Sequence, residues 1–577
     1  MKYLSKNWLN ILAPALIAFS TLSEASGFAD YQPAPAYEET TEASSYVTMR
    51  DGVKLAISVV RPAKNGKPVD GKFPVIWHHT LSISREARDG TGGFISALHA
   101  IPTLAKHGYV VVQVARRGNG QSFGVMRGYH DRNEAFDAYE MTQWLAEQPW
   151  SDGNVGVYGC SNTGDAAMHA MSVQPPALKA VFAGCFSWHK FDAFRRGAIF
   201  AQWGTGPART IEDDMAIPPV DGDEDKKLQR QAAEEHQLAT PLLQMWSELP
   251  FRDSWSKTVG SRFWSEGSVA DYKDQVVRSG IPLYIMGGWF DELRDQGLIT
   301  LLNVPGSRAI VGPWQHCRND DFPLLDEIHR FFDTHLKGLE TGLNQEPPLH
   351  YFVMEGSKKG HWASSSTWPV EGVDFKAFAM TDSGLKNHSQ AGGTLDQQFD
   401  VKFEQNCPGE KISSRSQPCS THEEGIHITS EPLFHAMEVT GHPKITVNLS
   451  TNRNDANLFA YLEDVAPDGS VTVITEGRLK ASMRKTDIAP WLMPEGTPWH
   501  RWYKEDQLLL TANEPVELTF AMMPTSWVFA ANHKIQVTFT GSDYRERLRD
   551  DAGHAQTIRL TSPSSGTAVL MLPVAGN

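Results

Sequence analysis

The chain has 577 residues, of which 41% are hydrophobic and 21% are charged, and its formal net charge is −15. This length exceeds what one hydrophobic core usually organises, so we expect two or three domains in a folded globular protein rather than a disordered one. The negative charge argues against nucleic acid or an anionic membrane as the main partner, because both would repel the protein.

The N-terminus has the features of a secretion signal. Lys2 and Lys6 give a positive start, and residues 11–22 are apolar apart from two hydroxyl side chains. Ser23 and Ala25 are small residues at the positions that a signal peptidase reads, so we expect cleavage after Ala25. The apolar stretch is short for a membrane anchor. The sequence therefore predicts a periplasmic or secreted protein that has no membrane span after signal removal.

From about Ser45 the chain alternates between short apolar stretches and helical patterns. Such near-continuous apolar strands are buried on both faces, as in a parallel sheet, and their alternation with helices predicts a layered α/β domain. The expected strands are 73–77, 109–114, 155–158, 180–183, 283–286 and 308–311, and the expected helices are 97–107, 131–148, 162–173 and 323–337.

Two other regions have a different texture. Residues 207–272 contain prolines, a charged run and then many aromatic side chains in helical patterns, which predicts a helical insertion over the sheet. After Pro347, short alternating strands recur with Gly, Pro, Asn and Asp between them, which is typical of an antiparallel β-sandwich. The clearest of these strands are expected at 444–449, 457–462, 471–474 and 535–539.

Ser161 lies in a turn between a predicted strand and a predicted helix. Gly159 and Gly164 supply the small neighbours that a serine in strained geometry needs. The hydroxyl would lie at a helix N-terminus, where the peptide dipole favours developing negative charge, and the Asn162 N–H would point into the same oxyanion site. A nucleophile is one interpretation of Ser161, and a helix-capping serine is the other.

An acid and a base follow in the order that a nucleophilic serine requires. Asp291 ends the strand expected at 283–286, and His316 ends the strand expected at 308–311. Open α/β sheets place their sites at these C-terminal strand ends, so we expect the three side chains to meet. His316 would take the proton of Ser161, and Asp291 would orient the imidazole and stabilise its charged form.

At these residues the sequence resembles the cocaine esterase/NonD family of hydrolases, which is related to the X-Pro dipeptidyl-peptidases. Its Gly-x-Ser-x-x-Gly, Gly-Trp-Tyr/Phe-Asp and Gly-Pro-Trp-x-His motifs are matched around Ser161, Asp291 and His316. The resemblance implies a serine hydrolase that cleaves an ester or amide bond of a small acyl substrate through an acyl-enzyme, without a cofactor, and the N-terminal signal adds export. The sequence features predict a signal peptide at 1–25, an α/β-hydrolase domain at 45–206 and 273–345, a helical cap insertion at 207–272 and a C-terminal β-sandwich at 347–577, which the resemblance implies is of the jelly-roll type.

The sequence departs from the family at the second oxyanion donor. Family esterases use a Tyr after the strand at 73–77, and Leu81 stands at the expected place here. His79, Thr80 or a backbone N–H of the same loop are the alternatives for this donor, beside the N–H of Asn162. For the wall of the substrate pocket we expect Trp203, Trp289, Phe290 and Arg294.

Three functions remain open at this point. In the α-amino-acid ester hydrolases of the family, part of a carboxylate cluster that holds the substrate ammonium lies two and three residues beyond the catalytic Asp. Leu293 and Arg294 stand there in this chain, so we do not expect α-amino recognition of that type. Arg294 either suits an anionic or neutral acyl group or is a plain surface residue, which is the favoured alternative, and Glu292 is the acidic residue nearby. The alternatives are an X-Pro-type dipeptidyl aminopeptidase or an α-amino-acid ester hydrolase, and a binding protein built on an inactive hydrolase domain. Assembly into a homo-oligomer stays open.

Five cysteines would meet an oxidising compartment after export. Cys407 and Cys419 flank a polar loop, and we expect a disulfide between them. Cys160 and Cys185 end two neighbouring strands, where either a bridge or a pair of small buried residues would fit, and the latter is favoured. Cys317 directly follows His316. The odd count leaves at least one thiol free, and no spacing is typical of a metal site.

Overall fold

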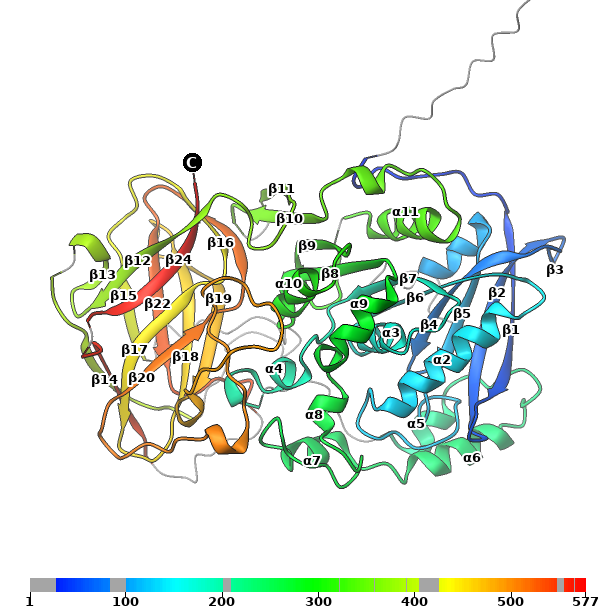
Figure 1. Cartoon of the computed structure of the whole chain (residues 1–577), viewed down its shortest axis with the longest axis horizontal. Coiled ribbons are helices and arrows are strands. Elements are labelled where there is room, and N and C mark those ends of the chain that lie inside the picture. Colours follow the sequence, from blue (N-terminus) through cyan, green and yellow to red (C-terminus); the bar gives the residue numbers. More distant parts are fainter. Residues whose placement is uncertain are drawn as a thin grey trace, which may run out of the picture.

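The computed structural model describes residues 27–83, 100–200, 209–320, 322–356, 359–390, 392–403, 425–546, 555–564 and 566–576. The expected signal peptide, Trp203 and the expected Cys407–Cys419 pair lie outside the described residues. An α/β part occupies one side of the molecule and a β-rich part occupies the other (Figure 1).

A mixed sheet forms the centre of the α/β part. Its strands have the order β1-β2-β5-β4-β6-β7-β8-β9, antiparallel up to β5 and parallel from β5 onward. All the strands expected here are present, several of them longer than predicted. They are β1 (Glu39–Thr48), β2 (Lys54–Lys64) with the short β3 (Lys67–Pro68), β4 (Phe73–Thr80), β5 (Val110–Ala115), β6 (Ser151–Cys160), β7 (Leu178–Gly184), β8 (Leu283–Phe290) and β9 (Arg308–Gln315).

Helices cover both faces of this sheet, which explains why its strands are apolar on both sides. Successive residues of a strand point to opposite faces: Trp77 packs in the core that α2 (Arg132–Ala146) and α3 (Asn162–Ser172) share, whereas Ile76 packs in the core that contains α11 (Leu324–Leu336). Asp131 caps α2 by accepting the Glu134 N–H at 3.1 Å. The remaining helices of the sheet domain are the 3-10 helix η1 (Ile101–His107), α4 (Lys190–Phe194), η2 (Arg196–Ala198), α9 (Lys273–Ser279), α10 (Arg294–Asn303) and η4 (Leu343–Gln345).

The expected helical insertion consists of short helices that pack on the sheet domain through aromatic side chains. Trp246, Phe263 and Trp264 are fully buried in the same core as the sheet residues, whereas Trp255 is exposed. This aromatic layer fixes the insertion to the sheet domain. The helices are α5 (Ile211–Met215), α6 (Lys227–His236), α7 (Leu242–Ser247), α8 (Phe263–Glu266) and η3 (Val269–Tyr272).

The C-terminal part is an antiparallel β-sandwich. One sheet has the order β15-β22-β18-β19, and side chains from β17 and β18 meet in one core between the layers. The strands after β10 (Leu349–Met354) are β11 (Gly360–Ser365), β12 (Val373–Thr381), β13 (Gly384–Asn387), β14 (Asp396–Asp400), β15 (Ile426–Thr429), β16 (Met437–Gly441), β17 (Lys444–Thr451), β18 (Asn457–Val465), β19 (Val471–Lys480), β20 (Val516–Ala521), β21 (Thr525–Phe529), β22 (Lys534–Thr540), β23 (Thr557–Thr561) and β24 (Ala568–Ala575).

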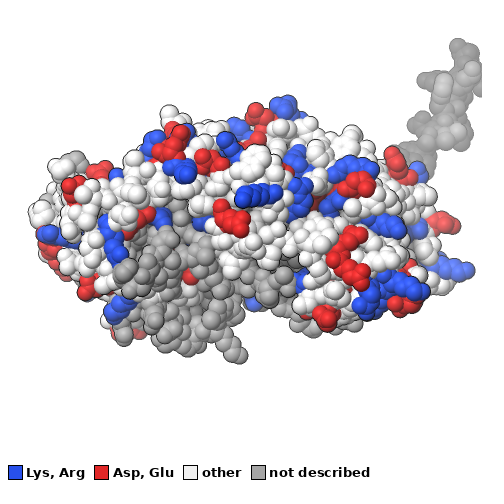
Figure 2. Space-filling view, turned by 90° about the horizontal axis from the view of Figure 1, so that it is seen from below, with Lys and Arg blue, Asp and Glu red and all other residues white. Residues whose placement is uncertain are grey.

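Strand β10 joins the two parts, because it pairs with β9 of the α/β sheet and with β21 of the sandwich. Acidic and basic side chains are interspersed over the face seen in Figure 2, as expected for a surface that stays in water. Within the described ranges, each helix is too short or too polar to cross a membrane.

Candidate active site

Ser161 occupies a strained turn between β6 and α3. Its backbone has φ 61° and ψ −132°, a conformation that non-glycine residues rarely adopt. A Cβ at Gly159 would lie 2.1 Å from the Thr163 carbonyl oxygen, and one at Gly164 would lie 2.5 Å from that of Gly184. Larger residues would therefore not fit at either glycine. The Ser161 side chain makes no capping hydrogen bond to α3, so the helix-cap interpretation is wrong.

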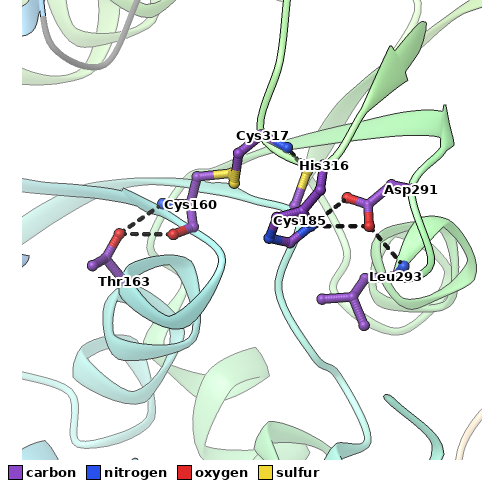
Figure 3. The surroundings of a disulfide bond; sticks show 7 residues. All are labelled: Cys160, Thr163, Cys185, Asp291, Leu293, His316 and Cys317. Atoms are coloured by element: carbon purple, nitrogen blue, oxygen red, sulfur yellow. Dashed lines mark hydrogen bonds and ion pairs between the residues drawn. A yellow bond between two sulfur atoms is a disulfide. The ribbon is translucent and has the colours of Figure 1, made fainter. Parts of the chain in front are cut away.

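Asp291 and His316 meet at the C-terminal ends of β8 and β9 (Figure 3). The His316 Nδ1 lies 3.0 and 3.1 Å from the two oxygens of Asp291, and the Leu293 N–H donates to the same carboxylate at 2.9 Å. Burial by itself would raise the pKa of Asp291, but His316 and the hydrogen bonds bring this pKa below its ordinary value. Asp291 therefore stays ionised and can hold the imidazole in one orientation.

A disulfide joins Cys160, which precedes Ser161, to Cys317, which follows His316, with their Cα atoms 6.1 Å apart. The favoured interpretation of Cys160 and Cys185 as two small buried residues is wrong for Cys160, as is the alternative of a bridge between them. The chain turns back after β9 with φ 54° at Cys317, which brings this residue to the end of β6. Cys185 is buried with a free thiol, and its Sγ accepts the Cys317 N–H at 3.3 Å.

Asn162 is held firmly at the start of α3. The Arg116 Nη1 lies 3.3 Å from its side-chain oxygen and 3.4 Å from its carbonyl oxygen, and the His130 Nε2 donates to that carbonyl at 2.7 Å. The Lys190 Nζ in turn lies 2.6 Å from the His130 Nδ1, and burial lowers the pKa of Lys190 to about 8. Sequence reasoning missed Arg116, His130 and Lys190. Only the position of Arg116 at the end of β5 could have indicated it.

His79 and Thr80 are the last two residues of β4. His79 is buried beside the Trp77 ring, and its Nε2 has no hydrogen-bond partner. Burial and the nearby positive charge of Arg116 hold the pKa of His79 well below its ordinary value, so its imidazole is neutral at neutral pH. A neutral imidazole keeps one N–H, so His79 has a donor to offer at this strand end.

Three of the four expected pocket residues lie in the described part of the chain, and two of them, Trp289 and Arg294, contact residues beyond the α/β sheet. The Trp289 Nε1 donates to the Phe352 carbonyl at 2.7 Å, and Phe290 is buried in the core. The Arg294 guanidinium donates to the Trp289 carbonyl and, at 3.3 Å, to the Thr475 hydroxyl of β19. These contacts join α10 to β19 of the β-sandwich, and the expected place of Arg294 in the wall of the substrate pocket stays a prediction.

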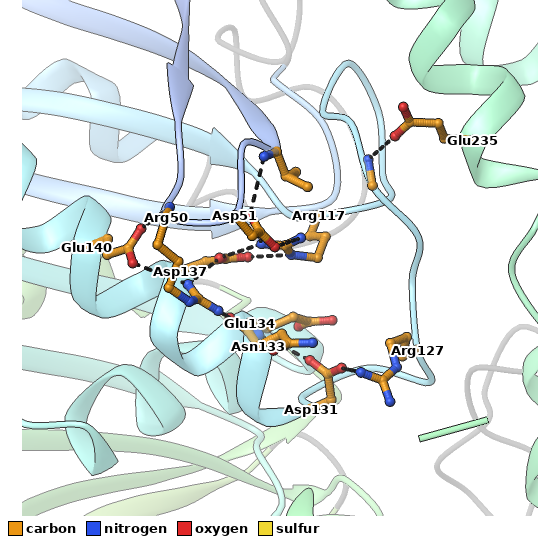
Figure 4. A network of polar contacts seen from close by, with 12 residues as sticks. Arg50, Asp51, Arg117, Arg127, Asp131, Asn133, Glu134, Asp137, Glu140 and Glu235 are labelled. Carbon is orange, nitrogen blue, oxygen red and sulfur yellow. Dashed lines mark hydrogen bonds and ion pairs between the residues drawn. The ribbon is translucent and has the colours of Figure 1, made fainter. Parts of the chain in front are cut away.

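The loop after β5 is anchored by a second arginine (Figure 4). Arg117 binds Asp137 of α2 with two hydrogen bonds of 2.8 Å and binds Asp51 of the β1–β2 turn at 2.7 Å. Within this loop, a Cβ at Gly118 would lie 2.3 Å from the Met126 backbone nitrogen. The Arg-Gly-x-Gly-x-Ser sequence therefore maintains the shape of a loop that also holds Arg116 beside Asn162.

Two groups of side chains with metal-ligand atoms lie among the described residues of this site, and in one of them, Cys160, Cys185 and Cys317, two sulfurs are already joined in the disulfide. In the other, the Cys185 Sγ, a carboxylate oxygen of Asp291 and a ring nitrogen of His316 are within 4.8 Å of one another. Because Asp291 and His316 already bind each other, we interpret their closeness as the hydrogen-bonded pair of the catalytic site.

The strained serine turn, the Asp–His pair and the sheet order define an α/β-hydrolase that carries a C-terminal β-rich domain. Residues 51–318 match the family model described as X-Pro dipeptidyl-peptidase (S15 family), and residues 341–573 match the C-terminal non-catalytic domain of X-Pro dipeptidyl-peptidases.

The chain is 30% identical to a Mycobacterium bovis protein named as a serine esterase, over 94% of this chain and 96% of that protein. It is also 26% identical to the cocaine esterase of Rhodococcus sp., over 86% of this chain and 90% of that one. The chain therefore belongs to the cocaine esterase/NonD family of hydrolases, which is related to the X-Pro dipeptidyl-peptidases.

Solved structures support the same fold. A CocE/NonD family hydrolase from Staphylococcus aureus superposes with a TM-score of 0.73 at 20% identity, covering 93% of this chain and 94% of that one. An α-amino acid ester hydrolase gives a TM-score of 0.66 at 17% identity, covering 98% of this chain and 100% of that one. The expected fold class, an α/β-hydrolase domain followed by a β-rich domain, is thus confirmed.

Proposed function

We propose that this protein is an exported serine hydrolase that cleaves an ester bond of a small acyl substrate through an acyl-enzyme on Ser161. His316 removes the Ser161 proton as the hydroxyl attacks the substrate carbonyl and later returns it to the leaving group. Water then attacks the acyl-enzyme with His316 again as the base. The Asn162 N–H stabilises the oxyanion together with a second donor from the end of β4, for which His79 is favoured over Thr80 or a backbone N–H.

The observation that carries this proposal is the pairing of Asp291 with His316 at one sheet edge with the strained turn of Ser161. The covalent link between Cys160 and Cys317 brings the flanking residues of the nucleophile and the base within 6.1 Å. Ser161 has no capping role, and a buried ionised carboxylate orients the histidine. Acyl transfer by a Ser–His–Asp triad explains both features.

Recognition of a substrate ammonium, as in an aminopeptidase, fits the site poorly. Burial, followed by the nearby charge of Asp291, raises the pKa of Glu292 well above its ordinary value, which favours the uncharged form of this side chain. A neutral carboxyl group offers little attraction to a free N-terminus. The next two residues are Leu293 and Arg294, which provide no carboxylate. Ester hydrolysis is therefore favoured over X-Pro dipeptidyl-peptidase or α-amino-acid ester hydrolase action.

The test compares wild-type protein with Ser161→Ala on a panel of p-nitrophenyl esters, β-lactams and dipeptidyl anilides. We expect turnover of an ester, a loss of about 10⁴-fold or more in kcat for the variant, and unchanged circular dichroism. A fluorophosphonate should label wild-type Ser161 and leave the variant unlabelled, as read by peptide mass spectrometry. Near wild-type turnover by the folded variant would refute the assignment, and preferred cleavage of dipeptidyl anilides would replace the ester specificity by peptidase specificity.

Export is tested separately, by expressing the full chain in a Gram-negative host and sequencing the N-terminus of the mature protein. We expect it to begin at Ser26 in the periplasm or the medium, because cleavage should follow Ala25. A cytoplasmic protein that retains Met1 would contradict export while leaving the hydrolase chemistry untouched.

A further inference from the structure

We propose that the Cys160–Cys317 disulfide is a positioning device of the catalytic site, which holds the turn of the nucleophile and the turn of the base in register. This inference rests on the proposed function, because it assigns the link a role in the reaction of Ser161 with His316. The activity of the protein should consequently depend on the oxidised state of these two cysteines.

The place of the bond in the chain is the first argument. It joins segments 157 residues apart at the two positions directly adjacent to Ser161 and His316. A bond that served general stability could lie anywhere between the strands, whereas this one lies between the two turns whose separation sets the Ser161–His316 geometry (Figure 3). Both turns depart from regular structure, with φ 61° at Ser161 and φ 54° at Cys317.

The strand pairing gives the second argument. Strands β6 and β9, which lead into the two turns, are not neighbours, because β7 and β8 lie between them in the sheet. Backbone hydrogen bonds of the sheet therefore connect the two strand ends only through β7 and β8 and do not join one turn directly to the other. A covalent link across two intervening strands supplies that direct connection, and an error of about 1 Å between reacting groups can reduce a rate 10²-fold.

Cys185 lies beside the Cys160–Cys317 disulfide, but its thiol is not expected to exchange with that bond. Sulfur atoms of Cys160, Cys185 and Cys317 lie within 4.8 Å of one another, so exchange of Cys185 into the disulfide is sterically close. The thiolate is the form that attacks a disulfide. Burial, followed by the negative charge of Asp291, raises the pKa of Cys185 well above its ordinary value, so the thiol stays protonated and the Cys160–Cys317 pairing persists.

The first experiment replaces both linked cysteines, as Cys160→Ala/Cys317→Ala, so that neither can pair with Cys185. We expect kcat for the best ester to fall about 10- to 100-fold with KM changed by less than about threefold, because positioning and not substrate binding is lost. Fluorophosphonate labelling of Ser161 should slow by a similar factor. The control is Leu560→Ala, which opens a cavity in the β-sandwich core far from the site and should lower Tm without lowering kcat.

The second experiment keeps the wild-type chain and removes the bond by chemistry. A water-soluble phosphine reduces the disulfide, with water supplying the oxygen of the phosphine oxide and the protons of the two new thiols. Because all three sulfurs are buried, reduction is followed over hours in mild denaturant, and the thiols are counted by alkylation of quenched samples. Activity should decline in step with reduction of Cys160 and Cys317 and return after reoxidation by oxidised glutathione.

The outcomes separate the two proposals. A Ser161→Ala protein with wild-type turnover would overturn the proposed function and the positioning role together. The positioning role alone would be overturned by either of two results, given that Ser161→Ala is inactive. One is wild-type kcat in the Cys160→Ala/Cys317→Ala variant, and the other is full activity of the fully reduced wild-type chain. If the double variant fails to fold, the reduction experiment on the wild-type chain still decides.

Discussion

Asp291 and Glu292 are adjacent carboxyl groups at the end of β8, and their surroundings shift their pKa values in opposite directions. Asp291 binds His316 and has a lowered pKa, whereas burial raises the pKa of Glu292. Asp291 is thus suited to orient an imidazole, whereas the uncharged form is favoured for the next residue, Glu292.

Asparagine at Asp291 and glutamine at Glu292 form a matched pair of variants. We expect Asp291→Asn to lower kcat by about 10⁴-fold, because the neutral amide no longer stabilises the imidazolium and favours the wrong tautomer. Glu292→Gln should retain kcat within about threefold, since it replaces one neutral group with another. The measurement is kcat at neutral pH. An equal loss in both variants would show that Glu292 acts as a charged group in binding or catalysis.

His79 is the favoured candidate for the second oxyanion donor. His79→Ala should lower kcat by about 10² to 10³-fold with little change in KM, the usual effect of one lost donor. Thr80→Val tests the alternative side chain at the same strand end. Full kcat in both variants would leave a backbone N–H as the second donor.

At the scale of elements, buried ion pairs hold the loop after β5 against α2, and the pair of Arg117 with Asp137 is one of them. Arg117→Ala would leave Asp137, whose side chain is fully buried, without the two hydrogen bonds that Arg117 gives it. Arg50 also contacts Asp137, at 2.9 Å, but its side chain is 35% exposed and offers a weaker interaction.

We expect Arg117→Ala to lower the free energy of unfolding by about 3 kcal/mol, because the buried charge of Asp137 keeps only the partly exposed Arg50 as a partner. Urea unfolding followed by circular dichroism measures this change. Arg559→Ala is the control, since the Arg559–Asp396 pair lies on the surface and its loss should leave no measurable change. Equal effects of the two substitutions would contradict the buried-pair argument.

At the scale of the whole molecule, the α/β part and the β-sandwich are in close contact at Gly197, where a larger side chain would not fit. This residue has φ 63°, and a Cβ there would lie 2.2 Å from the Arg478 carbonyl oxygen of β19. Two further contacts lie near this boundary, between Arg294 and Thr475 and between Trp289 and Phe352. Trp289 and Arg294 lie on either side of Asp291 in the chain, so the packing of the two parts helps to position the candidate active site.

Two glycine substitutions separate backbone strain from this contact. Gly222 has φ 86°, and a Cβ there would meet open space, so Gly222→Ala should cost only the left-handed backbone penalty of about 1 to 2 kcal/mol. Gly197→Ala should cost about 1 to 3 kcal/mol more, because the β-sandwich must shift, and kcat should fall as well. Thermal unfolding and ester turnover measure both effects. Equal Tm values for the two variants would show that the boundary yields without cost.

The sequence by itself determined the layered α/β domain, the β-sandwich and the residues around which the site is built. Strand and helix periodicity depends on neighbours a few positions away, and the Gly159–Ser161–Gly164 turn is likewise local. The order of Ser161, Asp291 and His316 along the chain was readable because parallel strands place their C-terminal ends at one edge.

Only the tertiary structure decided which distant groups meet. Cys160 ends β6 next to β7, yet its partner is Cys317, because the turn after β9 and not the strand order brings the second sulfur there. The Arg294 guanidinium binds the Trp289 carbonyl of its own part and reaches the Thr475 hydroxyl across the boundary between the two parts. Charge states and side-chain partners of this kind depend on burial and on residues that are distant in the chain, such as Cys317 for Cys160 and Thr475 for Arg294. No local pattern in the sequence records them.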